Sequence, residues 1–121
     1  MLYETFRKYG QAPFKIVLIH GGPGAAGELY PLALELSKNT GIIELLQTKK
    51  SIQSLLYEML HHINELCDKP VFLVGHSWGG MLASGYLGYA PEKVAKAVMA
   101  EPGFLNAQEQ KDWQEYLLVI I

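Results

Sequence analysis

The stretch VFLVGHSWGG, residues 71–80, decides the fold. It opens with four apolar residues, which predict a buried strand, and a helical pattern runs from about Trp78 to Tyr89. Ser77 stands between the two, at the apex of a sharp turn. Because the backbone beside such a turn must approach both the strand and the helix, we expect that side chains at Gly75 and Gly79 would clash. The stretch therefore predicts strand, turn and helix, with the Ser77 hydroxyl beside a helix N-terminus.

The spacing G-x-S-x-G over residues 75–79 is typical of a nucleophile elbow. The free N–H groups at the start of the following helix can stabilise negative charge that develops near the serine. Ser77 is therefore the candidate nucleophile, although the same spacing also occurs in a plain tight turn. His76 is adjacent to it, and neighbouring residues on such a turn point apart. We therefore expect His76 to have a core or supporting role.

The rest of the chain alternates between apolar runs and helical patterns. Ser51 stands where an N-cap is expected, at the start of an amphipathic stripe that runs to Cys67. Regular alternation with short turns favours an α/β fold, a parallel sheet with helices on both faces. Strands are expected at 14–20, 41–46, 70–75 and 93–100, with a short one near 2–6, and helices at 28–38, 51–67, 78–89 and 106–118.

A second unusual loop, Gly21–Gly27, follows the strand predicted at 14–20. If the strands that begin near residues 14 and 70 are neighbours, this glycine loop and the serine turn open onto one crevice at the carboxyl edge of the sheet. An activated serine needs an oxyanion hole, and one donor in this geometry is the N–H of the residue after it, Trp78. The other donor is expected from the glycine loop, with Gly22 favoured and Gly21 also open.

HGGPG at 20–24 together with GHSWGG at 75–80 resembles the α/β-hydrolase superfamily, and in particular the proline iminopeptidase-like (prolyl aminopeptidase-like) serine hydrolases. The likeness covers about residues 14–100. It implies an acyl-enzyme at Ser77 formed from an ester or a peptide-like amide, and an oxyanion hole made by the backbone of Trp78 and Gly22. It also implies that His20 stabilises the loop. The other residues of the two motifs are Gly21, Pro23, Gly24, Gly75, His76 and Gly79.

The sequence departs from this family in its triad. The family needs an acid and then a histidine after the serine, whereas all four histidines of this chain precede Ser77. Glu101, which follows the last predicted parallel strand, is a candidate acid, and the alternative is a turn residue. The histidines on the 51–67 helix, His61 and His62, are expected to be surface residues. We therefore expect one truncated hydrolase domain over residues 1–121, which lacks the C-terminal strands and the cap, and a catalytically inactive fragment or interaction module is the alternative.

A dinucleotide-binding domain is a further alternative. Gly22–Gly27 fits G-x-G-x-x-G between a strand and a helix, and Glu44 stands about where a ribose-binding acid is expected. Pro23 weakens this interpretation because it removes an N–H from a loop that should offer N–H groups to pyrophosphate. The dinucleotide interpretation also leaves the serine turn without a role.

Composition excludes several classes of function. The net charge of −2 gives no electrostatic reason to expect nucleic acid or an acidic membrane as a partner. Cys67 is the one cysteine, so no intrachain disulfide can form, and we expect no metal and no cofactor. We expect a cytoplasmic protein that acts on a small-molecule or peptide substrate. An open sheet edge at 93–100 and the apolar tail at 117–121 predict self-association.

Overall fold

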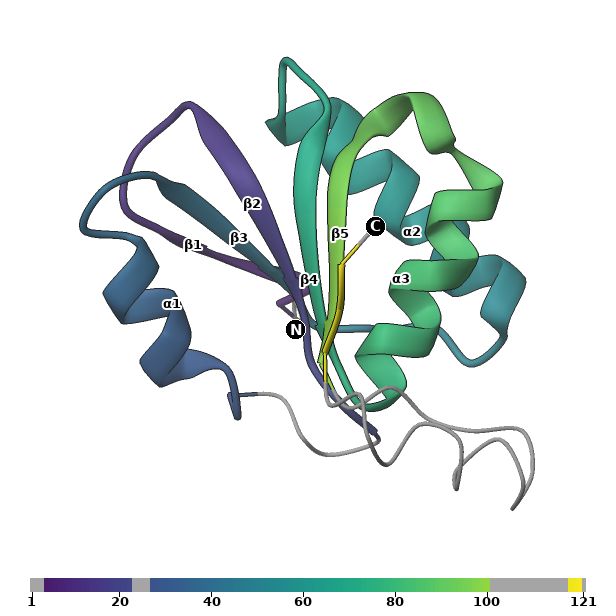
Figure 1. The fold of residues 1–121 in the computed structure, drawn as a ribbon. Helices are drawn as coiled ribbons and strands as arrows, with labels where there is room; N and C mark the ends of the chain where they lie inside the picture. Colours follow the sequence, from purple (N-terminus) through teal and green to yellow (C-terminus); the bar gives the residue numbers. More distant parts are fainter. Residues whose placement is uncertain (1–3, 23–26, 101–117, 121) are drawn as a thin grey trace.

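A computed structural model describes residues 4–22, 27–100 and 118–120, the last three by their backbone alone (Figure 1). The strands form one six-stranded sheet: β1 (Phe6–Tyr9), β2 (Phe14–Ile19), β3 (Gly41–Leu45), β4 (Val71–His76), β5 (Val94–Ala100) and β6 (Leu118–Ile120). The helices are α1 (Tyr30–Leu36), α2 (Ile52–Leu66) and α3 (Trp78–Tyr89), and a 3₁₀ turn, η1 (Pro91–Lys93), precedes β5.

The strand order is β1-β3-β2-β4-β5-β6. The four central strands are parallel, as the alternation of strands and helices predicts, whereas β1 and β6 pair antiparallel at the two edges. Residues 10–13 alone join β1 to β2, and β1 lies on the far side of β3. So short a connection reverses the chain and cannot make the long crossover that parallel strands need, so β1 runs antiparallel to both β2 and β3. The fold is α/β, with a mixed rather than purely parallel sheet.

The strand order brings the two unusual loops together. β2 is the direct neighbour of β4, and Ile19 at the end of β2 pairs with Gly75 near the end of β4. Both loops therefore leave the sheet at the same edge, where the carboxyl ends of the parallel strands lie. The adjacency predicted for the strands that begin near residues 14 and 70 is confirmed.

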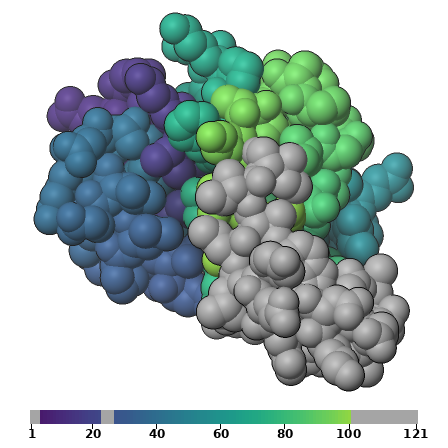
Figure 2. Space-filling model, in the orientation of Figure 1, coloured from purple at the N-terminus to yellow at the C-terminus, as the bar shows by residue number. Residues whose placement is uncertain are grey.

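Helices cover both faces of the sheet (Figure 1). Ala33 of α1 packs on Leu18 and Ile42 on one face, while Met59 of α2 and Tyr86 of α3 belong to a larger apolar core on the other. Figure 2 likewise places the surface of α1 and the surface of α3 on opposite sides of the molecule. Among the described residues, no helix has the length and apolar character needed to cross a membrane.

Element boundaries follow the sequence prediction to within one residue for α2, α3 and the four parallel strands, and less closely for α1 and β1. Ser51 caps α2 as predicted, because its side chain accepts a hydrogen bond from the N–H of Ser54. α1 is shorter than the predicted 28–38, and β1 lies at Phe6–Tyr9 rather than near 2–6. The helix predicted at 106–118 lies outside the described residues apart from Leu118, which belongs to a strand.

The prediction of an open sheet edge at 93–100 is wrong over the end of that strand. Val98, Met99 and Ala100 of β5 pair with β6, antiparallel. The physical reason is that the apolar segment near the end of the sequence, which is itself rich in β-branched residues, supplies a strand for the edge. The edge of the described sheet is therefore β6 and not β5 at this point.

Candidate active site

Ser77 lies on a strained turn between β4 and α3. Its φ is 56° and its ψ is −119°, a left-handed conformation that is uncommon for residues other than glycine. Hydrogen bonds hold the turn in place: the Ser77 N–H donates to the carbonyl oxygen of Ala100 at 2.9 Å, and the Gly80 N–H donates to that of Ser77 at 2.8 Å. Ser77 occupies the N-cap position of α3, but its side chain makes no capping hydrogen bond.

The two glycines that flank the serine are required by close backbone approach. A Cβ atom at Gly75 would collide with the carbonyl of Gly79, and a Cβ atom at Gly79 would collide with the carbonyl of Ile19 on β2. Backbone atoms of a helix or a sheet cannot move aside as the end of a side chain can. The predicted clash at both positions is confirmed.

The glycine loop lies directly against the serine turn. A Cβ atom at Gly21 would stand 3.3 Å from the carbonyl oxygen of His76 and 3.4 Å from the Cβ of Ser77. A Cβ atom at Gly22 would have no heavy atom within 4 Å, so open space adjoins that residue. The structure thus brings the predicted Gly21, His76 and Ser77 together at one place. Pro23 and Gly24 of the same motif, and the candidate acid Glu101, lie outside the described residues.

His20 stabilises the start of the loop. Its side chain is buried, and its Nδ1–H donates to the carbonyl oxygen of Gly21 at 2.6 Å. The Nε2 atom of the same ring is buried without a hydrogen-bond partner. The loop-supporting role that the resemblance implies for His20 is consistent with this geometry.

Two polar side chains that sequence reasoning missed connect the loop to the turn. Glu28 Oε1 accepts from the Gly21 N–H at 2.6 Å and from His76 Nδ1 at 2.9 Å. In the sequence, Glu28 looks like the first residue of a helix, and nothing in the pattern around it marks a role near Ser77.

Gln47, which follows β3, is the second missed residue. Its Nε2 donates to the carbonyl oxygen of His20 at 2.7 Å, and its Oε1 accepts from the indole Nε1–H of Trp78 at 3.0 Å. Its φ of 55° is positive, as is that of Ser77, and these are the two residues other than glycine with positive φ in the described chain. Strained residues of this kind cluster at functional sites.

The Glu28 carboxylate is held in its charged form. Burial acts to raise its pKa, but the hydrogen bonds from the Gly21 N–H and from His76 act in the opposite direction, and the pKa of Glu28 lies below its ordinary value. The side chains of Glu28 and His76 are 31% and 36% exposed, so solvent reaches this pair. The donors stabilise the carboxylate because they bind its charged form.

The two histidines of α2 lie away from this edge, near the helix end that precedes β4. His61 is exposed, as predicted. His62 corrects the prediction of a surface residue: its ring lies 4.9 Å from that of Phe6, its Nε2 is buried, and burial lowers its pKa. Packing between β1 and α2 explains the difference.

Glu44 does not fit the ribose-binding role that the dinucleotide interpretation needs. Its side chain is fully buried on β3, where it accepts a hydrogen bond from the Tyr9 hydroxyl at 3.0 Å and lies 3.9 Å from Arg7. A ribose-binding acid must instead reach the crevice at the strand end. Among the described residues, no group of histidine, cysteine, aspartate and glutamate side chains is suited to hold a metal ion.

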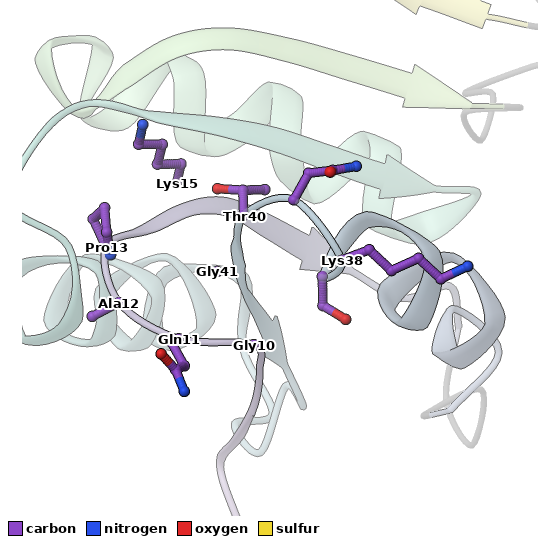
Figure 3. A pocket seen from close by; sticks show the side chains of 10 residues that line it. Gly10, Gln11, Ala12, Pro13, Lys15, Lys38, Thr40 and Gly41 are labelled. Atoms are coloured by element: carbon purple, nitrogen blue, oxygen red, sulfur yellow. The ribbon is translucent and has the colours of Figure 1, made fainter.

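A separate cavity of about 370 Å³ lies at the opposite end of the parallel strands from Ser77, where their amino ends lie (Figure 3). It is formed where β1 ends and where β2 and β3 begin, so it is remote from Ser77 along the strands. Its lining includes Gly10, Pro13, Lys15, Lys38, Thr40 and Gly41.

Comparison with known proteins agrees with the fold. Residues 15–119 match the alpha/beta hydrolase fold family. The chain is 31% identical to proline iminopeptidase of Lactobacillus helveticus (strain DPC 4571), in an alignment that covers 83% of this chain and 40% of that protein. The chain thus spans less than half the length of the curated relatives it matches.

Solved structures show the same architecture. A marine microorganism esterase superposes with a TM-score of 0.73 at 24% identity, over 91% of this chain and 47% of its own. The thioesterase domain from the curacin biosynthetic pathway superposes with a TM-score of 0.71 at 24% identity, over 93% of this chain and 48% of its own. These similarities concern the fold. With the family match over most of its length, the chain belongs to the α/β-hydrolase family.

Proposed function

We propose that Ser77 is the nucleophile of a serine hydrolase that cleaves an ester or a peptide-like amide through an acyl-enzyme. The observation that carries the proposal is the strained turn at Ser77, whose hydroxyl is not used to cap α3. Such a turn projects the serine from the end of a parallel strand, where ligands bind in open α/β sheets.

In the proposed reaction, Ser77 Oγ attacks the carbonyl carbon of the substrate. The Oγ proton passes through a general base to the leaving alcohol or amine, and water then hydrolyses the acyl-enzyme and restores the serine. The oxyanion that forms is stabilised by the backbone N–H groups of Trp78 and Gly22. Open space beside Gly22 supports this choice, while the Gly21 N–H is already bound to Glu28.

The substrate class is proposed from the relatives. The likeness to proline iminopeptidase favours release of an N-terminal residue from a peptide, and the esterase and thioesterase neighbours favour ester substrates. The general base and the acid are not assigned among the described residues, and Glu101 remains the candidate acid. Where no base serves Ser77, the same chain is an inactive hydrolase fragment or an interaction module.

The test is an intact-mass measurement after exposure to a fluorophosphonate. Attack by Ser77 forms an Oγ–phosphorus bond and expels fluoride, so one adduct is expected on the wild-type chain. Ser77→Ala is expected to show none, and Ser84→Ala, which alters another serine on α3, is the matched control that keeps the adduct.

A folded wild-type chain that gains no adduct would overturn the proposal of an activated serine. That outcome would favour the inactive fragment. An adduct that persists in Ser77→Ala would instead place the reactive group elsewhere.

A further inference from the structure

We propose that Glu28 and Gln47 are positioning residues that hold the glycine loop against the nucleophile turn. The inference rests on the proposed function, because it assigns how the loop and the turn are kept in register for that reaction. Neither side chain belongs to the two motifs in the sequence, and each bridges segments that are remote along the chain.

Glu28 connects Gly21 and His76, the residues that precede the proposed oxyanion donor and the proposed nucleophile. One carboxylate oxygen accepts from the Gly21 N–H, next to Gly22, and from His76 Nδ1, next to Ser77. A single atom therefore links the glycine loop to the end of β4. Because charge-assisted hydrogen bonds are stronger than neutral ones, the ionised carboxylate favours one fixed arrangement of both segments.

Gln47 makes a second bridge between the same two segments. Its amide reaches the carbonyl oxygen of His20, where the glycine loop begins, and the indole of Trp78, which follows Ser77. An amide is suited to this position because one end must donate to a carbonyl and the other must accept from an N–H. Its positive φ shows that the backbone after β3 adopts a strained conformation where the side chain makes these contacts.

The two bridges attach to the residues immediately before and after Ser77. Glu28 fixes the approach of the loop to residue 76, and Gln47 fixes its approach to residue 78. An oxyanion hole needs its two N–H donors at a set separation, and misplacement by about 1 Å can reduce a rate by roughly a hundredfold. The loop contributes one proposed donor and the turn the other, so their relative position determines the geometry of the hole.

The first experiment measures the rate of fluorophosphonate labelling in folded variants. Glu28→Leu and Gln47→Leu remove the bridges, and we expect each to slow labelling by roughly tenfold to a hundredfold. Glu28→Gln keeps one oxygen that can accept both hydrogen bonds, although each is weaker than a charge-assisted one, so the rate is expected to stay within about threefold of the wild type. Glu35→Leu and Gln53→Leu are matched controls at exposed positions and should leave the rate unchanged.

The second experiment does not depend on reactivity. In NMR spectra of the wild-type chain, the Gly21 amide proton is expected to shift as the Glu28 carboxyl titrates, with a midpoint below the ordinary pKa of a glutamate. Glu28→Gln should abolish that titration. Gln47→Leu should move the Trp78 indole N–H resonance, while Gln53→Leu should not.

The two readouts separate this inference from the proposed function. An unlabelled wild type with the expected NMR shifts would overturn the function and retain the two bridges. Folded Leu variants that label at the wild-type rate would overturn the positioning role. A Gly21 amide that does not respond to Glu28 would overturn that bridge, and this arm needs only the conservative Gln variant to fold.

Discussion

At the scale of single residues, the site depends on positions that carry no side chain as much as on the side chains that are present. Gly75 and Gly79 leave room for the strand, the turn and the helix to meet, and Gly21 lets the loop approach Ser77. Sequence spacing alone indicates the first two, because the G-x-S-x-G pattern implies the clash. It gives no reason to expect that Glu28 binds the loop.

We expect Gly79→Ala to destabilise the fold by about 3 kcal/mol or more, because the new methyl group would collide with the backbone carbonyl of Ile19. Gly88→Ala, in the same helix with open space beside it, should stabilise by about 0.5–1 kcal/mol through the helix propensity of alanine. Urea unfolding of both variants and of the wild type gives the two changes in the free energy of unfolding. Equal midpoints would contradict the clash.

At the scale of elements, α2 follows its sequence closely because its signals are local. The amphipathic stripe selects the buried face, which includes Leu55, Met59 and Ile63. The cap at Ser51 fixes the start, since its hydroxyl accepts from the N–H of Ser54 at 3.1 Å. α1 has no such side-chain cap and is only seven residues long, so its predicted bounds were too wide.

Ser51→Ala should therefore lower the free energy of unfolding by about 1 kcal/mol, the usual loss when a helix N-cap is removed. Gln53→Ala is the comparison, because its side chain is exposed in the first turn of the helix, whereas the hydroxyl of Ser54 accepts a hydrogen bond from that of Ser51 and is unsuitable as a control. Thermal and urea unfolding followed by circular dichroism give the difference. A Ser51 variant as stable as Gln53→Ala would show that the cap contributes little.

At the scale of the whole molecule, β6 is one of the two edge strands of the described sheet, and β1 is the other. The strand β6 is three residues long and pairs antiparallel with the end of the longer strand β5. Edge strands with apolar side chains pair with other chains. We therefore keep self-association as a proposal, now with β6 rather than β5 as the strand that would pair.

Sedimentation velocity over a wide range of protein concentration is expected to show a rising sedimentation coefficient. Val119→Lys places a charge on the edge strand and should shift the chain toward the monomer. Leu34→Lys adds the same charge to an exposed position on α1, away from this edge, and should not. A single coefficient at all concentrations for the wild type would contradict self-association.

The sequence by itself determined the central parallel strands, α2 and α3, the serine turn and the adjacent glycine loop. Each depends on a local signal, such as an apolar run, a cap or a glycine beside a sharp turn. The tertiary structure alone decided the antiparallel edge strands and the contacts of Glu28 and Gln47. His76 is 48 residues from Glu28, and Trp78 is 31 residues from Gln47. Contacts over such separations depend on how the segments that leave neighbouring strands pack against one another, and no local pattern in the sequence encodes these contacts.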